Sequence, residues 1–168
     1  MERILVPLDG SQLAEEVLTY AKRLATHTSG TIYLVRVVPS AQQLAAASFA
    51  GAASMEGVSV MNVPDIDRAV ALQLEEARAY LQGKAGKLRA EGFLAEWEVR
   101  QGVAADEIIK CARNNRIDII AISSHGRSGL GRLVFGSVSD RVLREAGIPV
   151  MVVKHPKGGG PSGSGEDS

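Results

Sequence analysis

The stretch SSHGRSGLGRLVFGS, residues 123–137, brings four glycines and two arginines close together after an apolar run. Glycine lets the backbone approach a ligand closely and adopt positive φ, so that its N–H groups can surround an anion. Arg127 and Arg132 would add positive charge beside them. This composition predicts a phosphate-binding loop.

Two common phosphate motifs do not fit this loop. A Walker A motif requires a lysine after its second glycine, but Ser137 follows Gly136. A dinucleotide-binding motif requires a third glycine or alanine at the position of Val134, after Gly129 and Gly131. The loop therefore belongs to another type of site.

The end of the loop also begins a predicted helix, residues 137–147. At Gly136 and Ser137, the unpaired N–H groups of this helix start would face the loop. The positive end of the helix would then favour binding of an anion there. The alternative is that Ser137 and Asp140 form a capping box and serve only to start the helix. The sequence alone leaves both interpretations open.

The overall composition excludes several classes of protein. Nineteen basic and nineteen acidic residues balance, so we expect neither nucleic acid nor an anionic membrane as a partner. No secretion signal or membrane-spanning run is evident, and the single cysteine, Cys111, excludes an intrachain disulfide. We therefore expect a cytoplasmic protein with one domain over residues 1–156. Cys111 is expected to be a half-buried residue that packs against its neighbours, not a nucleophile.

Strands and helices are expected to alternate along the chain. Apolar runs predict strands at 3–8, 31–38, 93–102, 116–123 and 148–154, and helical spacing of apolar residues predicts helices at 13–30, 65–90, 103–115 and 137–147. Such alternation indicates an α/β protein with a mainly parallel sheet covered on both faces. The strand at 93–102 alternates charged with apolar residues, which suits an edge position.

Two segments do not fit this alternation. Residues 39–64 carry one charge and are too long for an ordinary connection, so we expect either a mobile cover over the site or a disordered, flexible insertion. Residues 157–168 contain no apolar side chain and are expected to form a disordered tail.

Ligands of parallel sheets bind beyond the carboxyl ends of strands, and two suitable loops follow strands here. One is the loop at residues 123–137, and the other contains Asp9, Gly10 and Ser11. Asp9 would either bind a ligand or stabilise the turn and the start of the next helix.

Several motifs together resemble the universal stress protein family. They are His-Gly-Arg-Ser-Gly-Leu at 125–130, Gly-Ser-Val at 136–138, Ile-Pro-Val-Met-Val-Val at 148–153 and ILVPLDGS at 4–11. The match runs in order along the chain, apart from the insertion and the tail. The resemblance implies a flavodoxin-like, adenine nucleotide alpha hydrolase-like fold: three α/β/α layers around a five-stranded parallel sheet of order 3-2-1-4-5. It also implies a homodimer, for which the apolar strand at 148–154 is the candidate interface.

One branch of this family binds ATP, and the resemblance transfers its site to this chain. Gly126, Gly136 and Ser137 match its glycine motif, whereas Ser123 stands where that motif has its first glycine. Asp9 would hold ribose or a metal such as magnesium. The other implied site residues are Pro7, Leu8, Val37, Ile122, His125, Arg127, Gly129, Val138 and Ser139. Val37 and Ile122 are expected to be core strand residues whether or not they also contact a ligand. His125 could have a structural role instead of contacting phosphate.

These observations leave three hypotheses about function. The first is a regulatory protein that binds ATP without efficient turnover and whose state a protein partner reads. The second is a weak ATPase or autokinase that uses Asp9 for magnesium; the absence of a P-loop lysine argues against efficient hydrolysis. The third is a dimeric interaction module without nucleotide, marked by Ser123.

Overall fold

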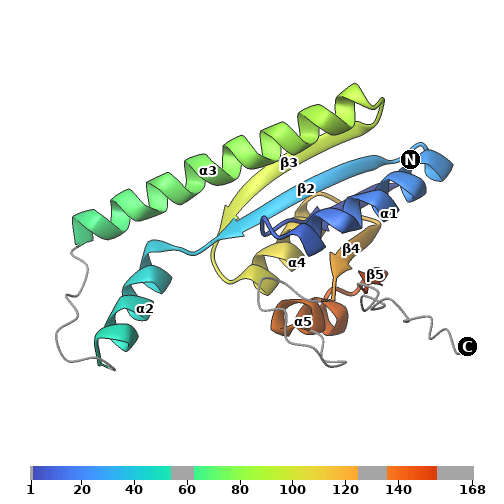
Figure 1. Cartoon of the computed structure of the whole chain (residues 1–168). Helices are drawn as coiled ribbons and strands as arrows, with labels where there is room; N and C mark the ends of the chain where they lie inside the picture. Colours follow the sequence, from blue (N-terminus) through green and yellow to red (C-terminus); the bar gives the residue numbers. More distant parts are fainter. Residues whose placement is uncertain (1, 54–62, 125–135, 155–168) are drawn as a thin grey trace, which may run out of the picture.

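The described part of the chain forms a sheet of five parallel strands with helices on both faces (Figure 1). The computed structural model describes residues 2–53, 63–124 and 136–154. The elements are β1 (Arg3–Pro7), α1 (Gln12–Thr28), β2 (Thr31–Val38), α2 (Ala41–Ala53), α3 (Val63–Ala90), β3 (Leu94–Gln101), α4 (Ala104–Asn114), β4 (Ile119–Ser123), α5 (Ser137–Glu145) and β5 (Val150–Val153). The strand order is β3-β2-β1-β4-β5, which confirms the predicted flavodoxin-like fold.

The core lies on both faces of the sheet because neighbouring residues of a strand point to opposite sides. In β1, the fully buried Ile4 and Val6 pack into a cluster with α1 and α3, and Leu5 packs into a second cluster with α4 and α5. Each such side chain contributes about 1.5–3 kcal/mol when it is buried. The strands thus form a rigid support for the loops at their ends.

The winding of the chain reverses at β1. This strand pairs with β2 on one side and with β4 on the other. The helices α1 and α3 lie on one face of the sheet, and α4 and α5 lie on the opposite face. A crevice forms at the carboxyl ends of strands where the winding reverses. The ends of β1 and β4, after which the sequence places its two candidate loops, belong to neighbouring strands at this point.

The first part of the segment 39–64 is helical, where the sequence predicts a mobile cover or a disordered insertion. The helix α2 is rich in alanine, which has the highest helix propensity. A capping box begins it: Ser40 Oγ accepts the N–H of Gln43 at 3.3 Å, and Gln43 Oε1 accepts the N–H of Ser40 at 2.9 Å. α2 packs beside α3 (Figure 1). Residues 54–62 and the predicted tail at 157–168 lie outside the described residues.

The strand β3 occupies one edge of the sheet, as its alternating sequence predicts. Gly102 N–H donates to Val38 O at 3.0 Å, so by alternation the carbonyl of Ala95 faces away from β2. Arg89 Nε and Nη2 donate to this Ala95 oxygen at 3.0 and 2.6 Å. The guanidinium thus satisfies an edge carbonyl that could otherwise pair with another strand.

Replacing Arg89 with alanine is expected to lower the free energy of unfolding by about 1–2 kcal/mol, because the edge carbonyl loses a charged donor. Chemical denaturation measures this change. The control is Arg78→Ala on the same helix, whose ion pair with Glu75 is mostly exposed, with side chains 54% and 71% accessible. The control should cost less than about 0.5 kcal/mol. Equal losses for the two variants would contradict this role of Arg89.

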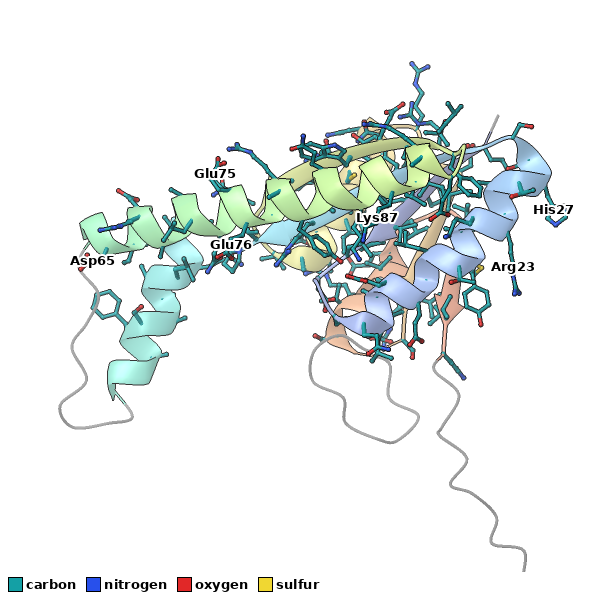
Figure 2. All side chains as sticks on the ribbon, turned by 45° about the horizontal axis from the view of Figure 1, so that its top comes forward. Arg23, His27, Asp65, Glu75, Glu76 and Lys87 are labelled. Carbon is teal, nitrogen blue, oxygen red and sulfur yellow. The ribbon has the colours of Figure 1, made fainter. Side chains whose placement is uncertain are left out.

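Polar contacts connect α3 with the first turn of α1. The Tyr80 hydroxyl donates to Glu15 Oε1 at 2.8 Å, and Lys84 Nζ lies 2.5 Å from Glu15 Oε2. Figure 2 shows α3 alongside α1. The hydrogen bond from Lys84 holds the pKa of Glu15 below its usual value, although burial opposes this shift.

This pKa shift predicts a pH-dependent contribution of Glu15 to stability. A lowered folded-state pKa stabilises the protein above the unfolded-state pKa, and the contribution disappears as pH falls through the folded-state pKa. Glu15→Gln is therefore expected to lower the free energy of unfolding at pH 7 by less than about 1 kcal/mol, because the pair is partly exposed. The difference from the parent protein should shrink towards pH 3. Glu76→Gln serves as the control, and a pH-independent difference for Glu15→Gln would contradict the assignment.

Candidate functional site

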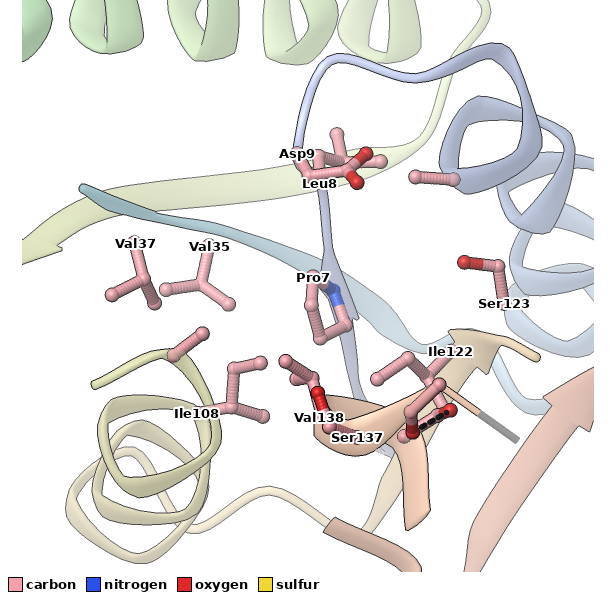
Figure 3. A pocket seen from close by; sticks show the side chains of 14 residues that line it. Pro7, Leu8, Asp9, Val35, Val37, Ile108, Ile122, Ser123, Ser137 and Val138 are labelled. Atoms are coloured by element: carbon pink, nitrogen blue, oxygen red, sulfur yellow. Dashed lines mark hydrogen bonds between the residues drawn. The ribbon is translucent and has the colours of Figure 1, made fainter. Parts of the chain in front are cut away.

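A cavity of about 330 Å³ lies at the carboxyl ends of β1, β2 and β4 (Figure 3). The helices α1, α4 and α5 complete its walls. The lining residues are Pro7, Leu8, Asp9, Ala14, Val35, Val37, Ala104, Ile108, Ile122, Ser123, Gly136, Ser137, Val138 and Ser139. Its volume is in the range of sites for small molecules.

Every predicted site residue that the structure describes lines this cavity. They come from three strand ends and from the first turn of α5: Pro7, Leu8, Asp9, Val37, Ile122, Ser123, Gly136, Ser137, Val138 and Ser139. The predicted residues His125, Gly126, Arg127 and Gly129 lie outside the described residues. The fold therefore brings the described candidates together, and their roles in binding remain predictions.

Sequence reasoning missed Ala14, Val35, Ala104 and Ile108. Val35 could have been found, because it lies two residues before Val37 and therefore on the same face of the strand. Ala104 and Ile108 are four residues apart and share one face of α4. No local signal in α4 indicates which face turns towards a ligand, since that depends on the packing of α4 over β2 and β3.

Asp9 has a structural role and also lines the cavity. Its Oδ1 accepts the N–H of Ser11 at 2.9 Å, which closes an Asx turn around Gly10 at φ 86°. Ser11 then caps α1 by accepting the N–H of Ala14 at 3.2 Å. Among the described residues, Asp9 Oδ2 accepts no hydrogen bond and is available at the cavity.

The start of α5 differs from the predicted capping box. The N-cap is Gly136, which provides no side-chain cap, and Ser137 is already the first helical residue. The carboxylate of Asp140 pairs with Arg144 at 2.8 Å instead of turning back to the helix start. A glycine N-cap leaves this end of the helix without a side-chain acceptor for the first N–H groups. The capping-box interpretation is therefore wrong.

As a result, N–H groups at the start of α5 are available to a ligand. Gly136 N–H donates to Ser124 O at 2.8 Å, and Asp140 N–H donates to Gly136 O at 2.9 Å. Within the described part of the chain, the N–H groups of Ser137 and Val138 have no acceptor. Both residues line the cavity, where the positive end of the helix favours an anion.

The opposite wall of the cavity is apolar. Val35, Val37, Ala104 and Ile108 line it, and Ile122 adds an apolar side chain nearer Ser123. Figure 3 shows Val35, Val37 and Ile108 grouped on the side of the cavity away from Ser123. Such a surface suits a flat aromatic ring, which gains free energy when it leaves water.

The backbone of Val37 adds polar groups beside this apolar wall. The last ladder bond between β1 and β2 runs from Leu8 N–H to Val35 O at 2.8 Å, so the carbonyl of Val35 faces β1. By alternation the N–H and C=O groups of Val37 face the same way, beyond this last bond. They are positioned to recognise the edge of a heterocyclic ring.

Ser123 ends β4 and lines the cavity. Figure 3 shows its hydroxyl directed towards the other lining residues. A serine here occupies more space than a glycine, and its hydroxyl can donate and accept hydrogen bonds. Ser123 thus narrows the cavity and adds a polar group to it.

Neither a reactive thiol nor a metal cluster is found in the described part of the chain. Cys111 is fully buried rather than half-buried, and burial raises the pKa of its thiol. The described residues contain no group of three or more histidine, cysteine or acidic side chains that could hold a metal. No helix in this part of the chain is long and apolar enough to cross a membrane.

Comparison with known proteins agrees with this architecture. Residues 1–154 match the model of the universal stress protein family. Universal stress protein Sll1388 of Synechocystis is 32% identical over 155 residues, covering 91% of this chain and 97% of that protein. Universal stress protein MJ0531 of Methanocaldococcus jannaschii is 30% identical over 157 residues, covering 93% and 84%.

Solved structures share the fold. A structure of MJ0577 superposes with a TM-score of 0.75 at 25% identity and covers 93% of this chain and 97% of that chain. A universal stress protein from Archaeoglobus fulgidus in complex with dAMP has a TM-score of 0.58 at 22% identity, with coverage of 90% and 97%. A family protein from Arabidopsis thaliana with AMP bound has a TM-score of 0.60 at 18% identity, with coverage of 93% for both chains.

Proposed function

This chain belongs to the universal stress protein family, and we propose that it is a regulatory protein of the stress response that binds an adenine nucleotide. ATP is the first candidate for this nucleotide. The observation that carries this proposal is the pairing of an apolar wall with an uncapped helix start in one cavity. Proteins of the same fold hold AMP and dAMP. The cavity offers the chemistry that such a ligand requires at both of its ends.

The adenine ring would occupy the apolar wall, between the strand residue Val37 and the helix residue Ile108. The ring edge would face the N–H and C=O groups of Val37. Asp9 would accept hydrogen bonds from the ribose hydroxyls through its available oxygen. By the family resemblance, Gly126 and Arg127 of the glycine loop would provide further phosphate contacts; residues 125–135 lie outside the described part of the chain.

The phosphates would lie at the start of α5. The N–H groups of Ser137 and Val138 can each donate to a phosphate oxygen, and the helix end favours the negative charge. In the alternative arrangement, Asp9 would hold a magnesium ion bound to the phosphates instead of the ribose, since Mg²⁺ in nucleotide sites commonly takes one or two carboxylates with phosphate oxygens and water. The metal would neutralise part of the phosphate charge beside this carboxylate.

The site supports binding better than turnover. Among the described residues, Asp9 is the one carboxylate that lines the cavity, and no lysine lines it. Efficient phosphoryl transfer needs a residue that positions the nucleophile and cations that stabilise the transferred group. The nucleotide would then act as a regulatory ligand in the cytoplasm, and a protein partner would read the occupied state.

The edge strand β5 supports a homodimer as the functional unit. Ile120 N–H donates to Pro149 O at 3.0 Å and Ser124 N–H donates to Val153 O at 2.9 Å, so by alternation the backbone groups of Val150 and Val152 face outwards. The apolar side chains of β5 are half-buried. A second copy could add its own β5 to this edge.

Incubating the purified protein with Mg-ATP and then identifying the nucleotide that stays bound tests this proposal. We expect close to one nucleotide per chain, recovered as ATP. Accumulation of ADP that Asp9→Ala abolishes would favour a weak ATPase instead. No bound nucleotide of any kind would favour the interaction module without nucleotide.

A further inference from the structure

Ser139 lines the cavity, yet its hydroxyl is directed at the protein rather than at a ligand. The residue is 3% exposed. Its Oγ lies within hydrogen-bond distance of two backbone oxygens, Ser124 O at 3.0 Å and Gly136 O at 2.9 Å. A hydroxyl has one proton to donate, and these two acceptors compete for it.

Two donors converge on the carbonyl of Ser124, and the Ser139 hydroxyl is one of them. Ser124 O also accepts the N–H of Gly136 at 2.8 Å. Ser124 itself is 6% exposed, and its N–H donates to Val153 O at 2.9 Å. The carbonyl is thus fixed to the sheet on one side and connected to the first turn of α5 on the other.

This arrangement closes the ends of the glycine-rich segment. Ser124 directly precedes residues 125–135 and Gly136 directly follows them. A bond between these two residues sets where the segment leaves and re-enters the fold. It also sets the direction of the N–H groups of Ser137 and Val138, which come next in the chain.

The geometry points to Ser139 as a positioning residue: its buried hydroxyl clamps α5 to the end of β4 and so aims the N–H groups of Ser137 and Val138 into the cavity. This inference rests on the proposed nucleotide site and deepens it. It differs from the role implied by the family resemblance, in which Ser139 surrounds the phosphates. A buried hydrogen bond between a side chain and the backbone keeps such N–H groups in place before a ligand arrives.

The test compares Ser139→Ala with Ser139→Thr, which keeps the hydroxyl. Hydrogen exchange of the nucleotide-free protein, followed by mass spectrometry, reports protection of the Gly136 and Asp140 amides, which donate to Ser124 O and Gly136 O. Calorimetric titration with Mg-ATP reports affinity. Ser48→Ala is the matched control, since Ser48 Oγ donates to Leu44 O at 3.0 Å in α2, away from the cavity.

We expect Ser139→Ala to weaken ATP binding roughly tenfold and to raise exchange at Gly136 before any nucleotide is added. Ser139→Thr should restore both properties, and Ser48→Ala should change neither. Unchanged exchange in nucleotide-free Ser139→Ala would overturn the clamp, because a residue that only contacts phosphate has no effect before the ligand is present. If the parent protein binds no nucleotide, the proposed function fails, and the exchange data still decide whether the clamp exists.

Discussion

Replacing Ala104 with tryptophan is expected to lower the affinity for adenine nucleotides about 100-fold or more. Ala104 is the first residue of α4 and lines the apolar wall of the cavity. An indole ring at this position would fill the space proposed for the adenine. Ala104 is only half-buried at a helix start, so the fold should tolerate the larger side chain.

Calorimetric titration with ATP, together with a thermal unfolding curve, measures this effect. The matched control is Ala41→Trp, since Ala41 is likewise the half-buried first residue of a helix but does not line the cavity. The control should bind ATP as the parent protein does. Undiminished ATP affinity in a folded Ala104→Trp protein would place the base elsewhere.

Two substitutions of Asp9 should separate its two roles. Asp9→Asn keeps an oxygen for the N–H of Ser11 but removes the charge, and we expect it to weaken ATP binding about 10- to 100-fold without loss of stability. Asp9→Ala also removes the acceptor of the turn. It should lose as much affinity and, in addition, about 1 kcal/mol of unfolding free energy.

Titration calorimetry and chemical denaturation of both variants decide between the roles. Loss of stability in Asp9→Ala with full ATP affinity in both variants would assign Asp9 to the turn alone. Loss of affinity in both, with loss of stability only in Asp9→Ala, is the outcome expected here. This comparison resolves the two roles that the sequence leaves open for Asp9.

The fold was predictable because its signals are local. The β-branched run of β2 between Gly30 and Pro39 predicts a strand, and the charged alternation of β3 predicts an edge position. Alternation of strands with helices then favours a parallel sheet, since connections of this kind are right-handed. The order of the strands came from the family resemblance rather than from periodicity.

The cavity was only partly predictable. Residues in loops after strands, such as Asp9 and Ser137, carry a signal because small and polar residues there interrupt the apolar pattern. Ala104 and Ile108 carry no such signal, because an apolar helix residue looks the same whether it packs on the sheet or faces a ligand. Their place at the cavity depends on tertiary packing.

Two interpretations from the sequence differ from the structure for physical reasons. The sequence predicts a mobile or disordered segment at 39–64 because this segment carries a single charge and is too long for an ordinary connection. Its alanines and the Ser40–Gln43 capping box nevertheless favour a helix over Ala41–Ala53. The predicted cap at Ser137 fails because Asp140 pairs with Arg144 instead. In each case an interaction between side chains or backbone groups close in sequence determines how the helix begins.

The most direct test of the proposed site is a nuclear magnetic resonance titration of the isotope-labelled, nucleotide-free protein with Mg-ATP. The amide signals of Val37, Ser137 and Val138 should shift together and saturate at one nucleotide per chain, because these groups surround the cavity from two sides. Amide shifts that cluster elsewhere on the protein, or none up to millimolar ATP, would contradict nucleotide binding at this site.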